Sequence, residues 1–287
     1  MKVLPKILLT FFLISFFTFN IFAVNPVFSE SAEKEEFDRI YKEYQGSQEE
    51  YKAAYDAYIL ARAQYLKFKT LASENNAIEK TRKMLSSRNE VLRKYLLTLK
   101  AKVFSQEGIG SATKELLSTR IDAEVVWYEN HSQKLSSAAT LNDLIADSNA
   151  AMAHYESMNS LIYEVLSKVV RGRVNDFEKR LTQDFAKISD KIIKIKEEER
   201  ADFKFSAEKI QIIERWIFET QGRVERSQGK IAEADSLIAL MEVGINKKKG
   251  YEVDYEQVLA RLSEAQQYLK EASSFLKEIV RQVKTAD

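Results

Sequence analysis

Hydrophobic side chains recur at alternating intervals of three and four positions over most of this chain, and the first such stretch is the most regular. Each of its two series has members seven residues apart: Phe37, Tyr44, Tyr51, Tyr58, Tyr65 and Ala72, then Ile40, Ser47, Ala54, Ala61 and Phe68. A mean spacing of about 3.5 residues is typical of a coiled-coil seam. The pattern therefore predicts one long helix over residues 34–73, packed along a partner helix.

Further segments keep a helical spacing of apolar residues, and we expect helices at 76–106, 112–137, 140–171, 175–243 and 252–284. Pairs typical of helix N-termini stand at three of these starts: Asn76 with Glu79, Thr140 with Asp143, and Asp254 with Gln257. Gly172 and Asn175 predict a kink or a fresh helix start. The charged run at 197–200 is a candidate hinge, and the glycine-flanked segment 244–250 is the clearest loop.

The interval from Glu30 to Asp287 contains no proline and no cysteine. Because an average protein carries about 5% proline, this absence indicates few ordinary turns. Short connections make sequential helices antiparallel neighbours. We therefore predict an all-α fold, an elongated antiparallel bundle with coiled-coil hairpins and about six long helices.

The first residues have the pattern of an export signal. Lys2 and Lys6 precede an uncharged, Phe-rich run over residues 7–24, as in secretory signal peptides. Small residues before Glu30 favour cleavage there, with Ala23 as a second site. An uncleaved anchor is the alternative, since a run of about 18 residues is close to the minimum for spanning a bilayer. We expect residues 1–29 to direct the protein outside the cytoplasm, to the periplasm, cell envelope or exterior.

Charge is balanced along the rest of the chain. Removing Lys2 and Lys6 from the 44 Lys and Arg residues leaves 42 bases against 43 Asp and Glu, a formal charge of −1. No basic field is present that would attract nucleic acid, so we expect no nucleic-acid partner. Acid-to-base pairs four residues apart, such as Glu90 and Lys94, indicate solvated helix faces.

Signatures of catalysis or cofactor binding are missing from the sequence. His131 and His154 do not have the spacing of zinc or di-iron sites, and we expect both at the surface or at a seam edge. The segment from Gly222 to Lys230 departs from the phosphate-binding loop in spacing and context. We expect no catalytic residue, no metal and no cofactor, and we place Trp127 in the core, together with Trp216.

Two features are candidates for contact with a partner. Tyr44, Tyr51, Tyr58 and Tyr65 form one stripe, which either packs a neighbouring helix or lines a groove for a peptide, glycan or partner helix. The triplet Lys247, Lys248 and Lys249 is either a solvated hairpin tip or a contact for an anionic membrane surface or envelope polymer.

These patterns predict an exported, non-enzymatic helical scaffold or interaction protein of the cell envelope or exterior, which holds loop tips such as 106–112 and 245–250 at fixed separations. Its partner would be a protein or an envelope component, with membrane contact only through an uncleaved N-terminal segment and with self-association left open. The alternatives are a holdase-like chaperone or carrier that clamps apolar clients between helical arms, and a bundle that encloses a small apolar ligand.

Overall fold

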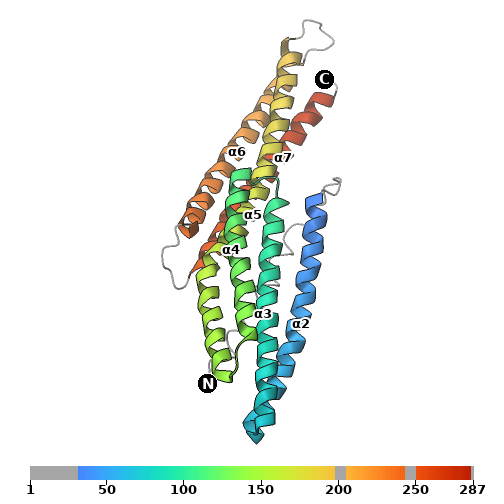
Figure 1. Ribbon diagram of the computed structural model, residues 1–287. Helices are drawn as coiled ribbons and strands as arrows, with labels where there is room; N and C mark the ends of the chain where they lie inside the picture. The colour runs from blue at the N-terminus through green and yellow to red at the C-terminus, as the bar shows by residue number, and fades with distance from the viewer. Residues whose placement is uncertain (1–31, 198–204, 243–249, 286–287) are drawn as a thin grey trace. The chain divides into compact units, whose positions relative to one another are not determined.

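The computed structural model describes residues 32–197, 205–242 and 250–285, and this part of the chain is helical throughout apart from its connections. The six helices are α2 (Ala32–Phe68), α3 (Leu71–Phe104), α4 (Ser111–Ser136), α5 (Leu141–Glu197), α6 (Ala207–Glu242) and α7 (Tyr251–Lys284) (Figure 1). No strand is present among the described residues. The all-α bundle expected from the apolar periodicity is therefore confirmed.

The predicted boundaries correspond to α2, α3, α4 and α7 to within five residues. A fresh helix start near Gly172, one of the two predicted alternatives, was wrong, because α5 continues through it for a total of 57 residues. The segment 175–243, for which a hinge at 197–200 was considered, is not one helix, since α5 ends at Glu197 and α6 begins at Ala207. Residues 198–200 of the candidate hinge lie outside the described part of the chain.

Gly172 permits a close approach between segments. A Cβ atom at this position would lie 2.7 Å from Cγ1 of Ile109 and 2.8 Å from Cγ of Gln106, both in the connection between α3 and α4. Asn175, one turn further along α5, donates a hydrogen bond of 2.9 Å to the carbonyl of Gly108. The glycine is needed for backbone contact, and the helix continues because packing outweighs its low helix propensity.

Helix N-termini agree with the local patterns at one of three predicted places. Thr140 and Asp143 cap α5 reciprocally: the Asp143 amide donates to Oγ1 of Thr140 at 3.2 Å, and the Thr140 amide donates to Oδ2 of Asp143 at 2.9 Å. The cap predicted at Asn76 was wrong, because α3 begins earlier and is capped by Thr70 with Ser73. The cap predicted at Asp254 was also wrong, since α7 directly follows Gly250, which makes no side-chain cap.

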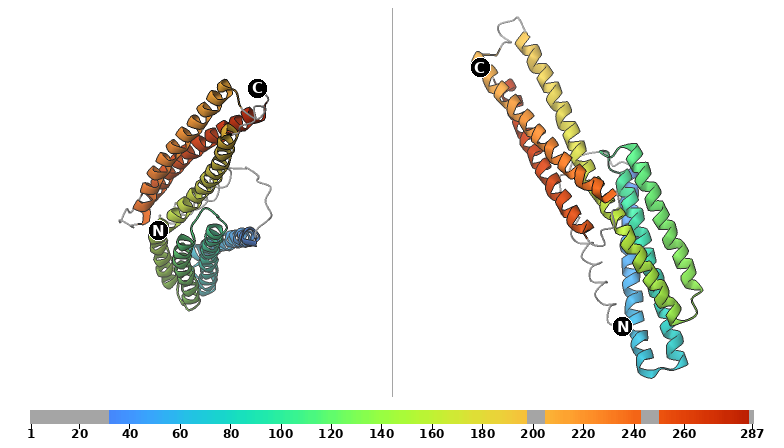
Figure 2. Two further views of the ribbon diagram at one scale, coloured as in Figure 1. Left: turned by 90° about the horizontal axis from the view of Figure 1, so that it is seen from above. Right: turned by 90° about the vertical axis from the view of Figure 1, so that its left-hand side faces the viewer.

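Helix α5 belongs to two hydrophobic cores. Its first half packs with α3 and α4 around residues that include Leu96, Leu117, Ile121 and Val165. Its second half packs with the α6–α7 hairpin around residues that include Ile213, Ile238, Leu262 and Leu269. Figure 2 shows α5 running through both groups of helices. At about 1.5 Å per residue, this shared helix is about 85 Å long.

Helix α2 lies beside α3 and is attached mainly through its side chains. Ala54 and Tyr58 of α2 join Met84 and Leu85 of α3 in a small core, which Leu135, Ala138 and Leu144 complete from the ends of α4 and α5. The tyrosine ring fills the space between the two helices. None of the described helices is both long and apolar enough to cross a bilayer.

Candidate functional site

The tyrosine stripe faces the neighbouring helices. Tyr58 is buried, and Tyr44, Tyr51 and Tyr65 are half-buried. The ring of Tyr44 lies 5.7 Å from that of Tyr95 on α3, and burial raises the pKa of Tyr51 to about 12. The stripe thus packs α2 within the bundle; contact with an external partner stays a prediction.

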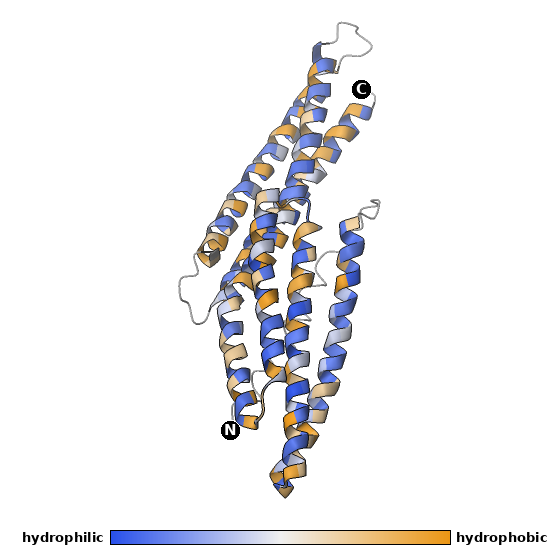
Figure 3. Cartoon of the chain, viewed as in Figure 1, coloured by the Kyte–Doolittle hydropathy of each residue, from blue (hydrophilic) through white to orange (hydrophobic). Residues whose placement is uncertain are grey.

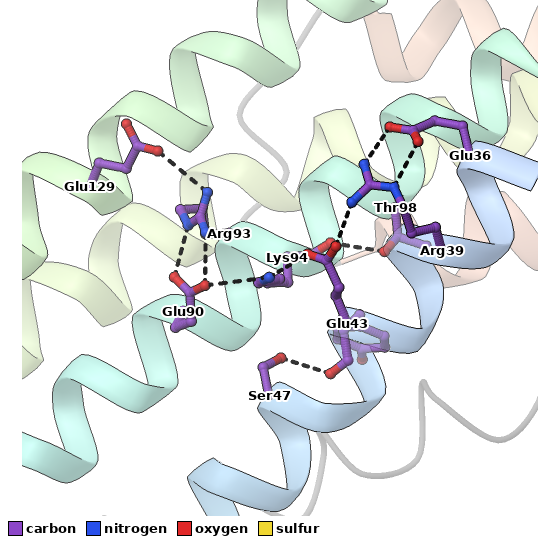
Figure 4. Close-up of polar contacts among 10 residues, drawn as sticks. Glu36, Arg39, Glu43, Ser47, Glu90, Arg93, Lys94, Thr98 and Glu129 are labelled. Atoms are coloured by element: carbon purple, nitrogen blue, oxygen red, sulfur yellow. Dashed lines mark hydrogen bonds and ion pairs between the residues drawn. The ribbon is translucent and has the colours of Figure 1, made fainter. Parts of the chain in front are cut away.

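An ion-pair network joins α2 to α3 beside these rings (Figure 4). Nζ of Lys94 lies 2.5 Å from Oε2 of Glu43, whose Oε1 in turn accepts a hydrogen bond from Arg39. The hydrogen bond from Lys94 lowers the pKa of Glu43. On α3, Arg93 pairs with Glu90 at 2.7 Å and reaches Glu129 of α4 at 3.4 Å. Charged contacts and tyrosine packing together fix α2 against its neighbours.

The turn between α2 and α3 gathers several exposed apolar side chains. All seven residues from Leu66 to Ala72 are exposed, and Phe68 and Leu71 keep 60% and 73% of their surface in contact with solvent. Orange, hydrophobic positions gather at this end in Figure 3. Phe68 was predicted to lie in the helix seam, and this was wrong because α2 ends at Phe68, where no helix covers it. We refer to residues 66–72 as the hairpin tip.

The hairpin tip extends past the other connection at the same end of these helices (Figure 1). Arg82 of α3 donates a hydrogen bond of 2.6 Å to the carbonyl of Ala138, which lies between α4 and α5. Leu71 precedes Arg82 by 11 residues, a distance of about 16 Å along a helix. The tip therefore reaches beyond the α4–α5 connection. Hydropathy spacing could not reveal this, because it does not give the relative ends of packed helices.

The two loop tips named from the sequence differ in outcome. The connection at 106–112 is not displayed as expected, because Ile109 is buried and Gly108 lies against the backbone of Gly172 in α5. A surface hollow of about 330 Å³ remains beside it, with Lys168 and Arg171 in its lining. The loop at 245–250 falls almost entirely outside the described residues, and with it Lys247, Lys248 and Lys249.

The two histidines flank one tryptophan. The rings of His131 and His154 lie 4.9 Å and 3.6 Å from the Trp127 ring, both nearly parallel to it. His131 is buried, so its expected place at the surface or a seam edge was wrong; its Nδ1 accepts a 2.8 Å hydrogen bond from the side-chain amide of Asn89. Burial lowers the pKa of His131. His154 donates to a carboxylate oxygen of Glu124 at 2.6 Å.

These histidines serve packing between helices. Each ring forms a hydrogen bond to a side chain on an adjacent helix, Asn89 for His131 and Glu124 for His154. The described residues contain no group of three or more side chains suited to hold a metal ion. Trp127 packs against the core of α3, α4 and α5, and Trp216 packs against that of α5, α6 and α7. Sequence spacing missed the stack because its members come from two helices.

Buried charges are paired across helices. Arg120 of α4 donates to both carboxylate oxygens of Glu164 on α5, each at 2.8 Å, and Glu164 is only 1% exposed. Lys134 of α4 pairs at 2.7 Å with Asp147 of α5, which is also buried. A buried carboxylate stays ionised at low cost only when a cation contacts it. These pairs fix the register of α4 against α5.

Comparison of the chain with protein-family models, curated proteins and solved structures gave no match. The hairpin tip is therefore singled out by its geometry alone. It gathers exposed large apolar side chains at a turn between two helices, whereas Phe218 on α6 stands within a long helix.

Proposed function

We propose that this chain is a non-enzymatic interaction protein of the cell envelope or exterior, in which a helical frame presents the hairpin tip to a partner. The exposure of residues 66–72 carries the proposal. Burying Phe68 and Leu71 against a partner would remove apolar surface from water, worth about 25 cal/mol for each square ångström. A solvent-exposed cluster of this kind is typical of an interaction site.

Contacts between α2 and α3 support the proposal that the hairpin tip is held in place. Glu43 with Lys94 and Tyr44 with Tyr95 join α2 to α3, and Tyr58 enters the small core nearer the tip. Binding to a hairpin that is already ordered costs less conformational entropy than binding that must first order the hairpin. Location outside the cytoplasm rests on the export signal predicted in residues 1–29.

Photo-crosslinking in the native host tests this function. The photoreactive residue benzoylphenylalanine replaces Leu71 in one variant and Phe218 in the other, two positions with matched exposures of 73% and 74%. We expect light-dependent adducts at position 71 and none at position 218. Absence of adducts at position 71, or the same adducts at both positions, would count against the proposal.

The chaperone, carrier and ligand-enclosing alternatives stay proposals of lower rank, because no observed contact favours them over presentation of the tip. A holdase would suppress aggregation of an unfolded client, whereas an interaction protein that acts through its tip would not. The second hollow, about 450 Å³ between α5 and α7, is lined by three lysines as well as by Ile188 and Leu276. This lining does not match a site for a purely apolar ligand.

A further inference from the structure

The hairpin tip carries a local charge that the whole chain lacks. Residues 57–73 include Arg62, Lys67 and Lys69 and no Asp or Glu, although the full chain has a formal net charge of only +1. Among the described residues, no carboxylate forms an ion pair with Lys67 or Lys69. The two ammonium groups are therefore available to an anionic surface.

The lysines and apolar side chains alternate around the turn. Lys67 and Lys69 flank Phe68, and Nζ of Lys67 lies 5.2 Å from the centre of its ring. Lys69 adopts a left-handed conformation with φ of 51°, which lets the chain reverse within two residues before Leu71 opens α3. Lysine stems are long enough for Phe68 and Leu71 to enter an apolar layer while the ammonium groups stay at its polar boundary.

We propose that the hairpin tip docks onto an anionic lipid bilayer, with Leu66, Phe68 and Leu71 entering the interface and Lys67 and Lys69 contacting headgroup phosphates. This inference rests on the proposed function and names its partner. Apolar burial combined with attraction of basic residues to anionic lipid is the physical basis of interfacial binding. Interfacial penetration is about 5–10 Å deep, and Leu71 stands seven residues before Ile78, which packs against the small core with Ala138, a rise of about 10 Å along the helix.

A lipid surface suits this tip better than a protein pocket does. The exposed apolar residues come from both helices and from opposite sides of a two-residue turn, so they form a protruding end without a flat face. A protein partner would need a deep cavity with matching acidic groups, whereas lipid molecules rearrange around a protrusion. This contact adds a second route to the membrane beside the N-terminal segment predicted from the sequence.

A fluorescent reporter placed in the full chain tests the docking, and the absence of cysteine makes the labelling specific. Leu71→Cys and Phe218→Cys each receive one nitrobenzoxadiazole group, whose emission rises and shifts to shorter wavelength in an apolar environment. Each variant is mixed with vesicles of phosphatidylcholine alone or with added phosphatidylglycerol. We expect a severalfold rise at position 71 on the anionic vesicles and no change at position 218.

The lysines are tested in the Leu71→Cys background. Replacing Lys67 and Lys69 by Gln should weaken partitioning onto anionic vesicles roughly 30-fold. Each basic residue near such a surface strengthens binding about fivefold, and the two factors multiply. The labelled chain with Lys52, an exposed lysine of α2, replaced by Gln is the control and should bind as before. Bilayer contact by residues 1–29 alone would not depend on Lys67 and Lys69.

Three outcomes would overturn the inference. The emission of the probe at position 71 could stay unchanged on anionic vesicles, or the probe at position 218 could respond equally. Binding could also be independent of both the lipid charge and the two lysines. If position 71 forms adducts with a protein in cells and its probe shows no fluorescence change on anionic vesicles, the lipid partner is rejected but the proposed function is not. Absence of any adduct at position 71 in cells, whether with protein or with lipid, would instead reject the proposed function itself.

Discussion

Gly108 and Gly172 touch through their backbones: a Cβ atom built on Gly108 would lie 1.8 Å from the carbonyl oxygen of Gly172. One glycine is in the α3–α4 connection and the other is inside α5. This contact seats the connection on the helix that both hydrophobic cores share, so the two positions tolerate no larger side chain.

Gly108→Ala is expected to lower the free energy of unfolding by about 2–4 kcal/mol, because the new methyl group meets backbone atoms that cannot rotate away. Urea denaturation followed by circular dichroism measures the change. The matched control is Gly222→Ala within α6, where an added Cβ meets nothing within 4 Å. That substitution should stabilise the protein by about 0.5–1 kcal/mol through helix propensity. Similar behaviour of the two variants would contradict the close contact.

His131 should make stability depend on pH near neutrality. Burial lowers its pKa in the folded protein below the ordinary 6.5, so the unfolded chain binds the proton more readily. Its contribution is present above pH 6.5 and is lost as pH falls toward the folded pKa. Between about pH 7.5 and 5.5, the free energy of unfolding should decrease, and His131→Gln should flatten that slope. The same slope in wild type and variant would show that His131 does not titrate in this way.

The Arg120 and Glu164 pair should be costly to break from one side. Arg120→Met leaves a carboxylate of 1% exposure without its principal cation and should cost about 2–3 kcal/mol of unfolding free energy. Replacing both residues by Met should cost less than Arg120→Met alone, since no buried charge remains. As a control, Arg39→Met removes exposed pairs on α2 and should leave the melting temperature unchanged. A double variant less stable than the single one would argue against this account.

Tyr51 should resist ionisation in the folded chain, because burial raises its pKa from 10.0 to about 12. A raised acid pKa gives stability that is present below the unfolded value and lost as pH rises above 10. Tyr51→Phe should therefore reduce the loss of stability between about pH 10 and 11, as measured by thermal melting. Tyr65→Phe, also on the stripe, serves as the comparison. Identical alkaline melting curves for wild type and Tyr51→Phe would refute the assignment.

Local chemistry determined the helices and part of their boundaries. The apolar spacing along residues 34–73 selects a helix wherever it lies, and Thr140 caps α5 through Asp143 only three residues away. Such interactions stay within one or two turns, so sequence neighbours contain the information needed to predict them. The tyrosine stripe was likewise recognisable, since residues seven apart share one helix face.

Tertiary contacts decided the features that local rules misread. Gly172 has a low helix propensity, yet it stays helical because only a residue without a side chain fits against Gly108. His131 is buried because Asn89, 42 positions earlier, supplies its hydrogen bond. Phe68 keeps the spacing of the seam but is exposed, because α2 ends where its neighbours provide no cover. Periodicity fixes which face of a helix is apolar, whereas burial depends on which other helix reaches that face, and that is set by packing between distant segments.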